Sequence, residues 1–398
     1  MIFQSLDDKS ECVGLYIDDK LLFNQLPSDL SLTHTWQYSP SMELYGDIEC
    51  ANLYCAGQSI GEVCPEHLQD NWSQINGKLK AYFRSFSEAK VSLEDNCFFD
   101  LVPHQFLLEY CEIKNKITKH VFDNYEKPQD YDFLFALAKF IAQVDKQRLT
   151  IEKQNLKPHL HKLKARNFAK KINKTTPYCK YNLFGTKTGR LTTKKDSFPV
   201  LTLDKDYRDI LIPSNNAFVE IDFNAAELRT LLALSGHEQP DEDLHAWNAK
   251  HIYEGLISRD EAKKKVFAWL YNPESKDYHF ENYYDRELVK QKYWDGEYVR
   301  TIFGREIRAD DHYALNYIVQ STASDMFLRQ ILKINELLKD KQSFIAFCVH
   351  DSFIIDLARE ERNLIYEIAE KFSQTNFGDF KVNIKIGKNY GEMKEVRL

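Results

Sequence analysis

Two aspartates, each next to an apolar segment, place the strongest constraint on how this chain can fold. AFVEID, residues 217–222, has the apolar content of a strand and ends at Asp222. FIAFCVH and FIIDL predict two further strands, and the tight connection between them carries Asp351. The chain is therefore expected to form a sheet that presents both carboxylates at strand ends.

Carboxylates presented in this way suit a metal site. Mg²⁺ takes hard oxygen ligands and keeps positions open for water and substrate phosphates, so a site with few protein ligands is sufficient. Asp222 and Asp351 could thus share a pair of metal ions. Taken singly, each aspartate is more often a turn or capping residue, and at this point that alternative stays open.

Four side chains spaced four residues apart form a second candidate site in the segment RDEAKKKVFAWLY. On a helix, Arg259, Lys263, Phe267 and Tyr271 make one slowly drifting stripe of two cations followed by two aromatic rings. Guanidinium and ammonium groups suit phosphates, and an aromatic face suits a base or sugar, so the stripe could hold a nucleoside triphosphate. The alternative is a solvated helix with a half-buried aromatic edge.

Charge is distributed unevenly along the chain, although the net charge is −7. Residues 1–100 carry 16 acidic and 6 basic side chains, whereas residues 146–195 carry 15 Lys or Arg and a single acid, Glu152. Such a cationic segment can follow a phosphate backbone. A solvated basic face is the alternative.

The composition excludes several classes of protein. A chain of 398 residues with 43% hydrophobic residues is long and apolar enough for two or three globular domains. It has no run long enough to span a membrane, and its first residues lack a signal-peptide pattern, so we expect a soluble intracellular protein. The eight cysteines include no CxxC pair and are expected to be reduced thiols. Cys50, Cys55 and Cys64 could bind zinc, but their spacing is irregular.

Helical periodicity surrounds these segments. Apolar residues recur at three-to-four spacing from about Phe98 to Leu163, and a helix is expected over AAELRTLLALSG, ending at Gly236. The stripe helix should run from about Ser258, as N-cap, to Leu270, where Asn272-Pro273 stops it. A long helix is expected from about residue 312 to residue 338.

These segments together resemble a known family. DFNAAELR, residues 222–229, is similar to motif A of family A DNA polymerases, the stripe is similar to motif B, and VHDS, residues 349–352, is similar to motif C. Other segments resemble further motifs in the family's order: KTGRLTT around Arg190, DLHAWNA around His245, TIFGRE around Arg305, and NYIVQSTASD with Asn316 and Gln320. Each motif is weak alone, but seven in order are specific.

The resemblance covers about residues 175–390, with a weaker thumb-like match upstream. It implies an α+β, right-hand polymerase fold with an antiparallel palm sheet, helical fingers and a helical thumb, plus a small N-terminal domain. The expected boundaries are 1–97 for the N-terminal domain, 98–195 for the thumb and basic DNA-binding segment, 196–240 for the palm with motif A, 241–300 for the fingers with motif B, and 301–398 for the palm with motif C.

The resemblance also implies a role for each site residue. Asp222, Asp351 and the backbone carbonyl of Phe223 would ligate two Mg²⁺ ions, for which Mn²⁺ can substitute, and Lys263 would donate a proton to pyrophosphate. The implied dNTP contacts are Arg259, Lys263, Phe267, Tyr271, His245 and Glu227. The implied contacts to primer–template DNA are Arg190, Arg229, Arg305, Asn316, Gln320 and His350.

Glu227 favours a DNA polymerase over a single-subunit RNA polymerase, which is the first alternative function. In DNA polymerases of this family a Glu at this place blocks a 2′-hydroxyl, whereas the similar single-subunit RNA polymerases have a small residue there. An ordinary helix ion pair is the alternative reading of Glu227. Phe267, where some relatives have Tyr, predicts poor use of dideoxynucleotides. The second rival, a catalytically inactive fold that only binds DNA, is disfavoured because both Asp222 and Asp351 are present.

Three positions depart from the family pattern. Ser352 stands where motif C often has Glu, Ala225 stands where motif A often has Gln, and Asn272-Pro273 follows Tyr271 where Gly is usual. We expect altered activity or metal preference from the first, loss of a minor-groove contact from the second, and a different hinge for the fingers from the third.

The N-terminal segment is expected to lack proofreading. Asp47-Ile48-Glu49 and NCFFD, residues 96–100, faintly resemble the first two metal motifs of a 3′→5′ exonuclease, but the third does not appear. A degenerate remnant or an unrelated module is expected instead. The short form resembles phage enzymes of the family, which predicts a monomer that replicates DNA in the cytoplasm of a bacterial or phage-infected cell.

Overall fold

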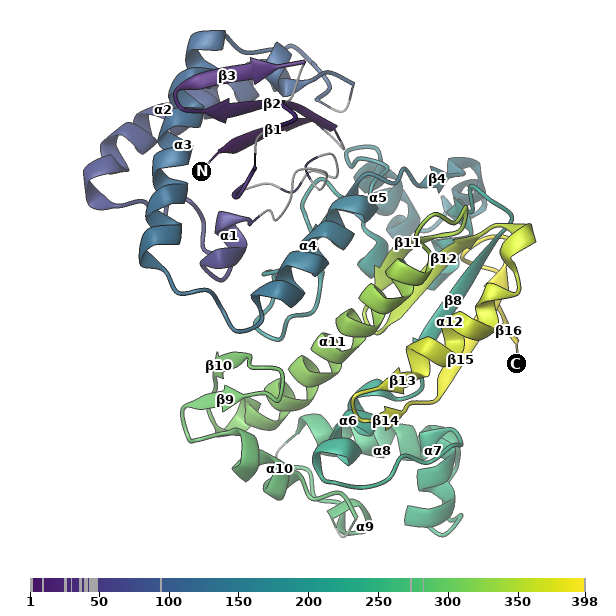
Figure 1. Cartoon of the computed structure of the whole chain (residues 1–398). Helices are drawn as coiled ribbons and strands as arrows, with labels where there is room; N and C mark the ends of the chain where they lie inside the picture. Colours follow the sequence, from purple (N-terminus) through teal and green to yellow (C-terminus); the bar gives the residue numbers. More distant parts are fainter. Residues whose placement is uncertain are drawn as a thin grey trace. The chain divides into compact units, whose positions relative to one another are not determined.

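The computed structural model describes residues 3–8, 11–24, 27–29, 31–35, 38, 42, 49–93, 95–272, 274–281 and 283–396. The chain divides into two compact units, Met1–Lys146 and Gln147–Leu398 (Figure 1). None of the helices in these described ranges is both long and apolar enough to cross a membrane.

The first unit joins a three-stranded antiparallel sheet to several helices. The sheet has the order β1-β2-β3. The bounds are β1 (Gln4–Asp8), β2 (Glu11–Ile17), β3 (Lys20–Phe23), α1 (Ala51–Tyr54), α2 (Glu66–Glu88), a 3₁₀ turn at Phe98–Asp100, α3 (His104–Asn124) and α4 (Tyr131–Asp145). In α3, Phe106, Tyr110, Ile113 and Ile117 recur at helical spacing and share a buried core with Leu6 of β1.

This packing places the domain boundary later than the sequence predicted. We expected residues 98–195 to form one thumb segment, but α3 and α4 belong to the first unit and the division falls after Lys146. The periodicity of α3 was recognised correctly. The elements against which α3 packs were not predicted, because an apolar helix face does not specify which element covers it.

The cysteine and exonuclease predictions both fall in this unit. Cys50, Cys55 and Cys64 are buried and free. Among the described residues no group of three or more His, Cys, Asp or Glu is arranged to hold a metal ion. Asp47 lies outside the described residues, and the Glu49 carboxylate lies 3.9 Å from His34 Nε2.

The second unit is built on a five-stranded antiparallel sheet with the order β11-β12-β8-β15-β16. Its strands are β8 (Ala217–Phe223), β11 (Phe344–Val349), β12 (Ser352–Leu357), β15 (Val382–Gly387) and β16 (Lys394–Val396). The strands predicted from AFVEID, FIAFCVH and FIIDL are therefore confirmed.

Side chains alternate between the two faces of β8, as strand geometry requires. Val219, Ile221 and Phe223 are buried, and the Phe223 ring stacks on Phe372 with centroids 4.0 Å apart. Phe372 belongs to α12 (Leu364–Ser373), which lies with α11 (Asp311–Leu337) across this face of the sheet (Figure 1). The opposite face of β8 carries Asp222.

Helices between β8 and α11 pack around a second core. They are α6 (Ala226–Leu234), α7 (Leu244–Trp247), a π-helical turn at Asn248–Ile252, α8 (Arg259–Tyr271), α9 (Tyr278–Glu281) and α10 (Arg286–Tyr293). In α8, Ala262, Val266, Trp269 and Leu270 are buried in this core, so the stripe occupies the neighbouring, more exposed side of the helix.

The ends of α8 agree with the prediction. The Ser258 hydroxyl accepts from the Glu261 amide and the Glu261 carboxylate accepts from the Ser258 amide, which together form a capping box. The helix ends at Tyr271 with Asn272 in an extended conformation, and Pro273 lies outside the described residues.

Short elements complete the second unit. They are β4 (Thr150–Ile151), α5 (Leu163–Ile172), β5 (Tyr181–Asn182), β6 (Thr192–Thr193), β7 (Leu211–Ile212), β9 (Tyr298–Arg300), β10 (Glu306–Arg308), β13 (Gln374–Thr375) and β14 (Gly378–Asp379), with 3₁₀ turns at Lys153–His159, Val200–Thr202, Lys205–Ile210 and Arg359–Glu361. In the basic segment, α5 buries only Ala165 and Ile172 and leaves its charged side chains at the surface.

Candidate active site

Sheet register brings the two predicted catalytic aspartates together. Ser352 of β12 lies directly opposite Asp222 of β8, and Asp351 precedes Ser352 in the chain. His350 and Asp351 form the two-residue connection between β11 and β12. His350 has φ of +56°, the left-handed conformation that a tight hairpin turn of this kind needs. Both carboxylates thus lie at the same end of the sheet.

The negative charges of the two carboxylates are only partly offset by nearby positive charges. Burial, and then the charge of Asp351, raise the pKa of Asp222 to about 7. Burial likewise raises the pKa of Asp351, and nearby cations offset this only in part. Asn383, opposite Asp222 on β15, donates from Nδ2 to Asp222 Oδ2 at 3.3 Å. A divalent cation between the two oxygen donors would relieve this repulsion, so the donor set fits a hard metal ion.

A pocket of about 500 Å³ opens beside Asp351. Most of its lining comes from α6, α8 and the β11–β12 connection. It includes eight residues predicted from the sequence: Arg190, Glu227, His245, Phe267, Tyr271, Gln320, His350 and Asp351. A volume of this size suits a nucleotide-sized ligand.

One wall of the pocket carries an ion pair. Glu227, in the first turn of α6, accepts from Arg190 Nη2. Burial raises the pKa of Glu227, and the Arg190 guanidinium opposes that rise. Only 12% of the Glu227 side chain is exposed, so the pair fixes a bulky acidic group at the pocket wall.

Another part of the pocket lining is the aromatic half of the stripe. The rings of Phe267 and Tyr271 stack with centroids 5.8 Å apart and planes 12° apart, and Lys263 Nζ lies 5.9 Å from the Phe267 ring centre. The His245 ring lies 6.1 Å from that of Phe267. Burial, together with nearby cations, lowers the pKa of His245 to about 4, so the imidazole is neutral at pH 7. Its Nδ1 is buried without a hydrogen-bond partner among the described residues.

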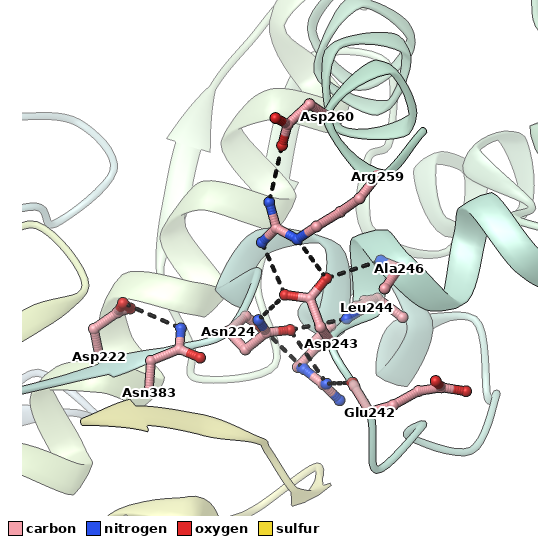
Figure 2. A network of polar contacts seen from close by, with 10 residues as sticks. Asp222, Asn224, Glu242, Asp243, Leu244, Ala246, Arg259, Asp260 and Asn383 are labelled. Atoms are coloured by element: carbon pink, nitrogen blue, oxygen red, sulfur yellow. Dashed lines mark hydrogen bonds and ion pairs between the residues drawn. The ribbon is translucent and has the colours of Figure 1, made fainter. Parts of the chain in front are cut away.

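Arg259 begins α8 and is held by carboxylates (Figure 2). Its Nε and Nη2 donate to the two oxygens of Asp243 at 3.1 and 2.9 Å, and its Nη1 donates to Asp260 Oδ1 at 3.2 Å. The Asp243 carboxylate also accepts from Asn224 Nδ2 at 2.7 Å and from the Ala246 amide at 2.8 Å. Burial favours the neutral acid, but these hydrogen bonds outweigh it and hold the pKa of Asp243 well below its usual range.

One residue predicted to contact DNA, Arg229, lies in the protein interior. Arg229 is fully buried, and its guanidinium donates to the carbonyl oxygens of Asn224, Pro240 and Glu242, each at 2.8 Å. A side chain surrounded in this way cannot reach DNA from this conformation. It instead fastens the loop before α7 to the end of β8.

Two other predicted DNA contacts lie outside the main pocket. Arg305 donates to both oxygens of Asp325 at 3.0 and 2.7 Å. Asn316 lines a smaller neighbouring pocket of about 130 Å³, which it shares with Tyr271.

Three residues at the site were not predicted: Asn224, Asp243 and Asn383. Asp243 and Asn224 lie inside the segments DLHAWNA and DFNAAELR, but the pattern gave no sign that they contact each other. A local signal existed for Asp243, since an aspartate before a short helix is a favoured N-cap. Asn383 had no such signal, because only the pairing of β15 with β8 brings it to Asp222.

Parts of the chain are similar in sequence to known DNA polymerases. No protein-family model matches the chain. The thermostable DNA polymerase I of Thermus aquaticus is 25% identical over 272 residues, which cover 55% of this chain and 33% of that protein. The DNA polymerase of Mycobacterium phage D29 is 24% identical over 192 residues, covering 39% of this chain and 31% of that protein.

A solved structure shows the same fold. The POL domain of Pol1 from M. smegmatis, in complex with DNA primer-template and dNTP, superposes with a TM-score of 0.56 at 13% identity. The match covers 72% of this chain and 76% of that domain. The two curated relatives are named as DNA polymerases, and the solved structure shows a shared fold. The chain spans about a third of the length of the curated relatives it matches.

The departures from the family A pattern have local explanations. The Ser352 hydroxyl is buried and donates to the Val349 carbonyl at 2.9 Å, so it closes the hairpin turn that carries Asp351. Ala225, the N-cap of α6, has φ of +54°. This left-handed conformation turns the chain from β8 into α6 and puts Ala225 and Glu227 on the pocket wall.

Proposed function

We propose that this protein is a template-directed DNA polymerase that adds dNTPs to a primer 3′-hydroxyl and releases pyrophosphate. The observation that carries the proposal is the shared pocket: Asp351, Glu227, His245, Phe267 and Tyr271 come from four separate segments and line one nucleotide-sized space. The relatives named as DNA polymerases support the same reaction.

Asp222 and Asp351, with the Phe223 carbonyl, would hold two Mg²⁺ ions or Mn²⁺ in their place. When bound, such ions lower the pKa of the primer hydroxyl and stabilise charge on the transferred phosphoryl group. The protein contributes the fixed strand ends that hold both carboxylates at one site, and Asn383 restrains one oxygen of Asp222.

The triphosphate would lie along the cationic half of the stripe. Arg259 and Lys263 supply positive charge, and the neutral His245 can donate a hydrogen bond from Nε2. Lys263, whose charge partly opposes the rise in the pKa of Asp351, would donate a proton to the leaving pyrophosphate. Phe267 would contact the sugar and Tyr271 the templating side of the new base pair.

The primer and template would contact polar groups around the pocket. Arg190, Gln320 and His350 line it directly, Asn316 lines the smaller pocket with Tyr271, and Arg305 is held by Asp325. In this reading the β8 sheet is the palm, the α8 region is the fingers, and the basic surface around α5 follows the DNA backbone.

Primer extension by the pure protein tests this function. With Mg²⁺ and a primed template of known sequence, we expect addition only of the dNTP that matches the next template base. Synthesis from rNTPs without a primer would support the RNA polymerase alternative. Binding of the primed template without extension would support the inactive DNA-binding fold.

A mismatched primer end in the same assay tests for proofreading. We expect the mismatched nucleotide to be retained, as no complete exonuclease motif set was found in the sequence. We further propose a monomer that acts in bacterial or phage DNA replication, in the cytoplasm. Sedimentation of the pure protein at assay concentration checks the monomeric state.

A further inference from the structure

Asp243 links the proposed triphosphate site to the strand that carries Asp222. Its carboxylate receives two hydrogen bonds from Arg259, one from Asn224 and one from the Ala246 amide (Figure 2). Asn224 follows Asp222 by two residues. Asp243 thereby joins the end of β8 to the first residue of α8 through side chains alone.

The β8 side of this link is held by hydrogen bonds within the protein. Asn224 is 3% exposed. Its backbone N–H donates to the Lys381 carbonyl at 2.9 Å, and its side-chain Oδ1 accepts from the Leu244 backbone N–H at 2.9 Å. The buried guanidinium of Arg229 holds the Asn224 carbonyl and the loop that leads to Asp243. Because Asn224 and Arg229 are themselves held by buried hydrogen bonds, they fix the position of the Asp243 carboxylate relative to the end of β8.

The Arg259 side of the link leaves room for a ligand. A guanidinium has five N–H groups, and Asp243 takes the Nε hydrogen and one hydrogen of Nη2. Asp260 takes one hydrogen of Nη1. One hydrogen on each terminal nitrogen is left without a contact in the described part of the chain. Those two hydrogens form the edge that binds a phosphate in bidentate fashion.

We propose that Asp243 is a positioning residue for triphosphate binding: it orients the Arg259 guanidinium so that its outer edge faces the phosphates, at a fixed distance from Asp222. This inference rests on the proposed function. Asn224 and the Ala246 amide also donate to Asp243, so its negative charge is shared among three partners. The carboxylate therefore competes only weakly with an incoming phosphate for the Arg259 guanidinium.

Substitution of Asp243 by Asn tests the proposal. Asn is also a favoured N-cap, so it preserves the start of α7 while it removes the charge that orients Arg259. Asp243→Ser, a second favoured N-cap, guards against a folding defect peculiar to one variant. Asp260→Asn is the matched control, because it removes the solvent-exposed carboxylate next to the same arginine.

Two readouts separate positioning from a structural role. We expect Asp243→Asn and Asp243→Ser to weaken binding of a fluorescent dATP analogue by the DNA-free protein roughly tenfold, and to raise KM for dNTP with little change in kcat. Asp260→Asn should change both by less than about twofold. In an Arg259→Ala background, Asp243→Asn should add no further loss, because residues that act through one contact are not additive.

Several results would overturn the inference. They are triphosphate binding by the Asp243 variants as tight as that of the wild type or tighter, an equal loss in the Arg259→Ala background, or no binding of the analogue by the wild type. If the analogue binds and the variants weaken it as expected but no primer is extended, the proposed function fails and the positioning role stands.

Discussion

Asp222 and Asp243 are two carboxylates of the proposed active site in opposite electrostatic surroundings. Asp222 faces another carboxylate and receives one long hydrogen bond, from Asn383, and its pKa is raised to about 7. Asp243 faces a guanidinium and receives four hydrogen bonds, and its pKa is held well below the usual range. A carboxylate that is already satisfied can orient a neighbour. One that is unsatisfied is suited to bind a cation that arrives with the substrate.

The same contrast separates two arginines of the site. Arg229 is fully buried and donates to backbone carbonyls, whereas the side chain of Arg259 is 47% exposed and retains an unused edge. Both were predicted from the sequence to contact a ligand. In the structure Arg229 is enclosed by protein, and Arg259 remains accessible to a ligand.

The largest expected effect is on catalysis. Asp222→Asn and Asp351→Asn should each lower the rate of single-nucleotide insertion by roughly a thousandfold or more, because each removes a proposed metal ligand. Rapid-quench primer extension at saturating dNTP measures this. If either variant retained a tenth of the wild-type rate, the proposed metal-binding role that distinguishes Asp222 from Asp243 would be contradicted.

Arg229→Met should cause the largest loss of stability. It removes the donor from one buried carbonyl group, that of Asn224, and from two partly buried ones, those of Pro240 and Glu242. We expect a fall of about 3–5 kcal/mol in the free energy of unfolding. Urea denaturation followed by tryptophan fluorescence provides the measurement. Arg259→Met is the matched control and should cost under about 1 kcal/mol, and equal losses in the two variants would contradict the distinction.

Glu227→Ala should increase ribonucleotide incorporation by roughly 10- to 100-fold relative to deoxynucleotide incorporation. The physical reason is the bulk that Glu227 places at the pocket wall. Glu227→Gln keeps that bulk and removes the charge that pairs with Arg190, so it should retain discrimination. Unchanged rNTP use by Glu227→Ala in primer extension would refute the role.

The smallest expected effect is a pH dependence of stability. A raised pKa means that folded Asp222 binds a proton between about pH 4 and pH 7 while the unfolded chain, with an ordinary pKa of 3.8, does not. Stability should therefore fall as pH rises through this range. In EDTA at pH 8, Asp222→Asn should be more stable than wild type by roughly 1–2 kcal/mol, after allowance for solvent screening.

Thermal melts of both proteins at pH 4 and pH 8 measure this difference. The two melting temperatures should converge at the lower pH, where wild-type Asp222 carries a proton. A gap that is equal at both pH values would point to a packing effect of the substitution instead.

Local sequence patterns predicted much of this site. The strands that carry Asp222 and Asp351, the capped helix α8 and its stripe follow from periodicity and turn chemistry, which depend on neighbouring residues. The burial of Arg229 could not be predicted, because it depends on the carbonyls of a loop more than ten residues away. The packing of α3 against the first unit, and hence the domain boundary, likewise depends on residues that are distant in the sequence.

Mn²⁺ binding tests the central claim most directly, since it does not depend on turnover. Free Mn²⁺ can be measured by electron paramagnetic resonance in mixtures with the protein, a dideoxy-terminated primer–template and the matching dNTP. We predict that Asp222→Asn binds Mn²⁺ at least about tenfold more weakly than the wild type, while Asp243→Asn at saturating dNTP binds it as the wild type does. Equal Mn²⁺ affinity in the wild type and Asp222→Asn would contradict the account.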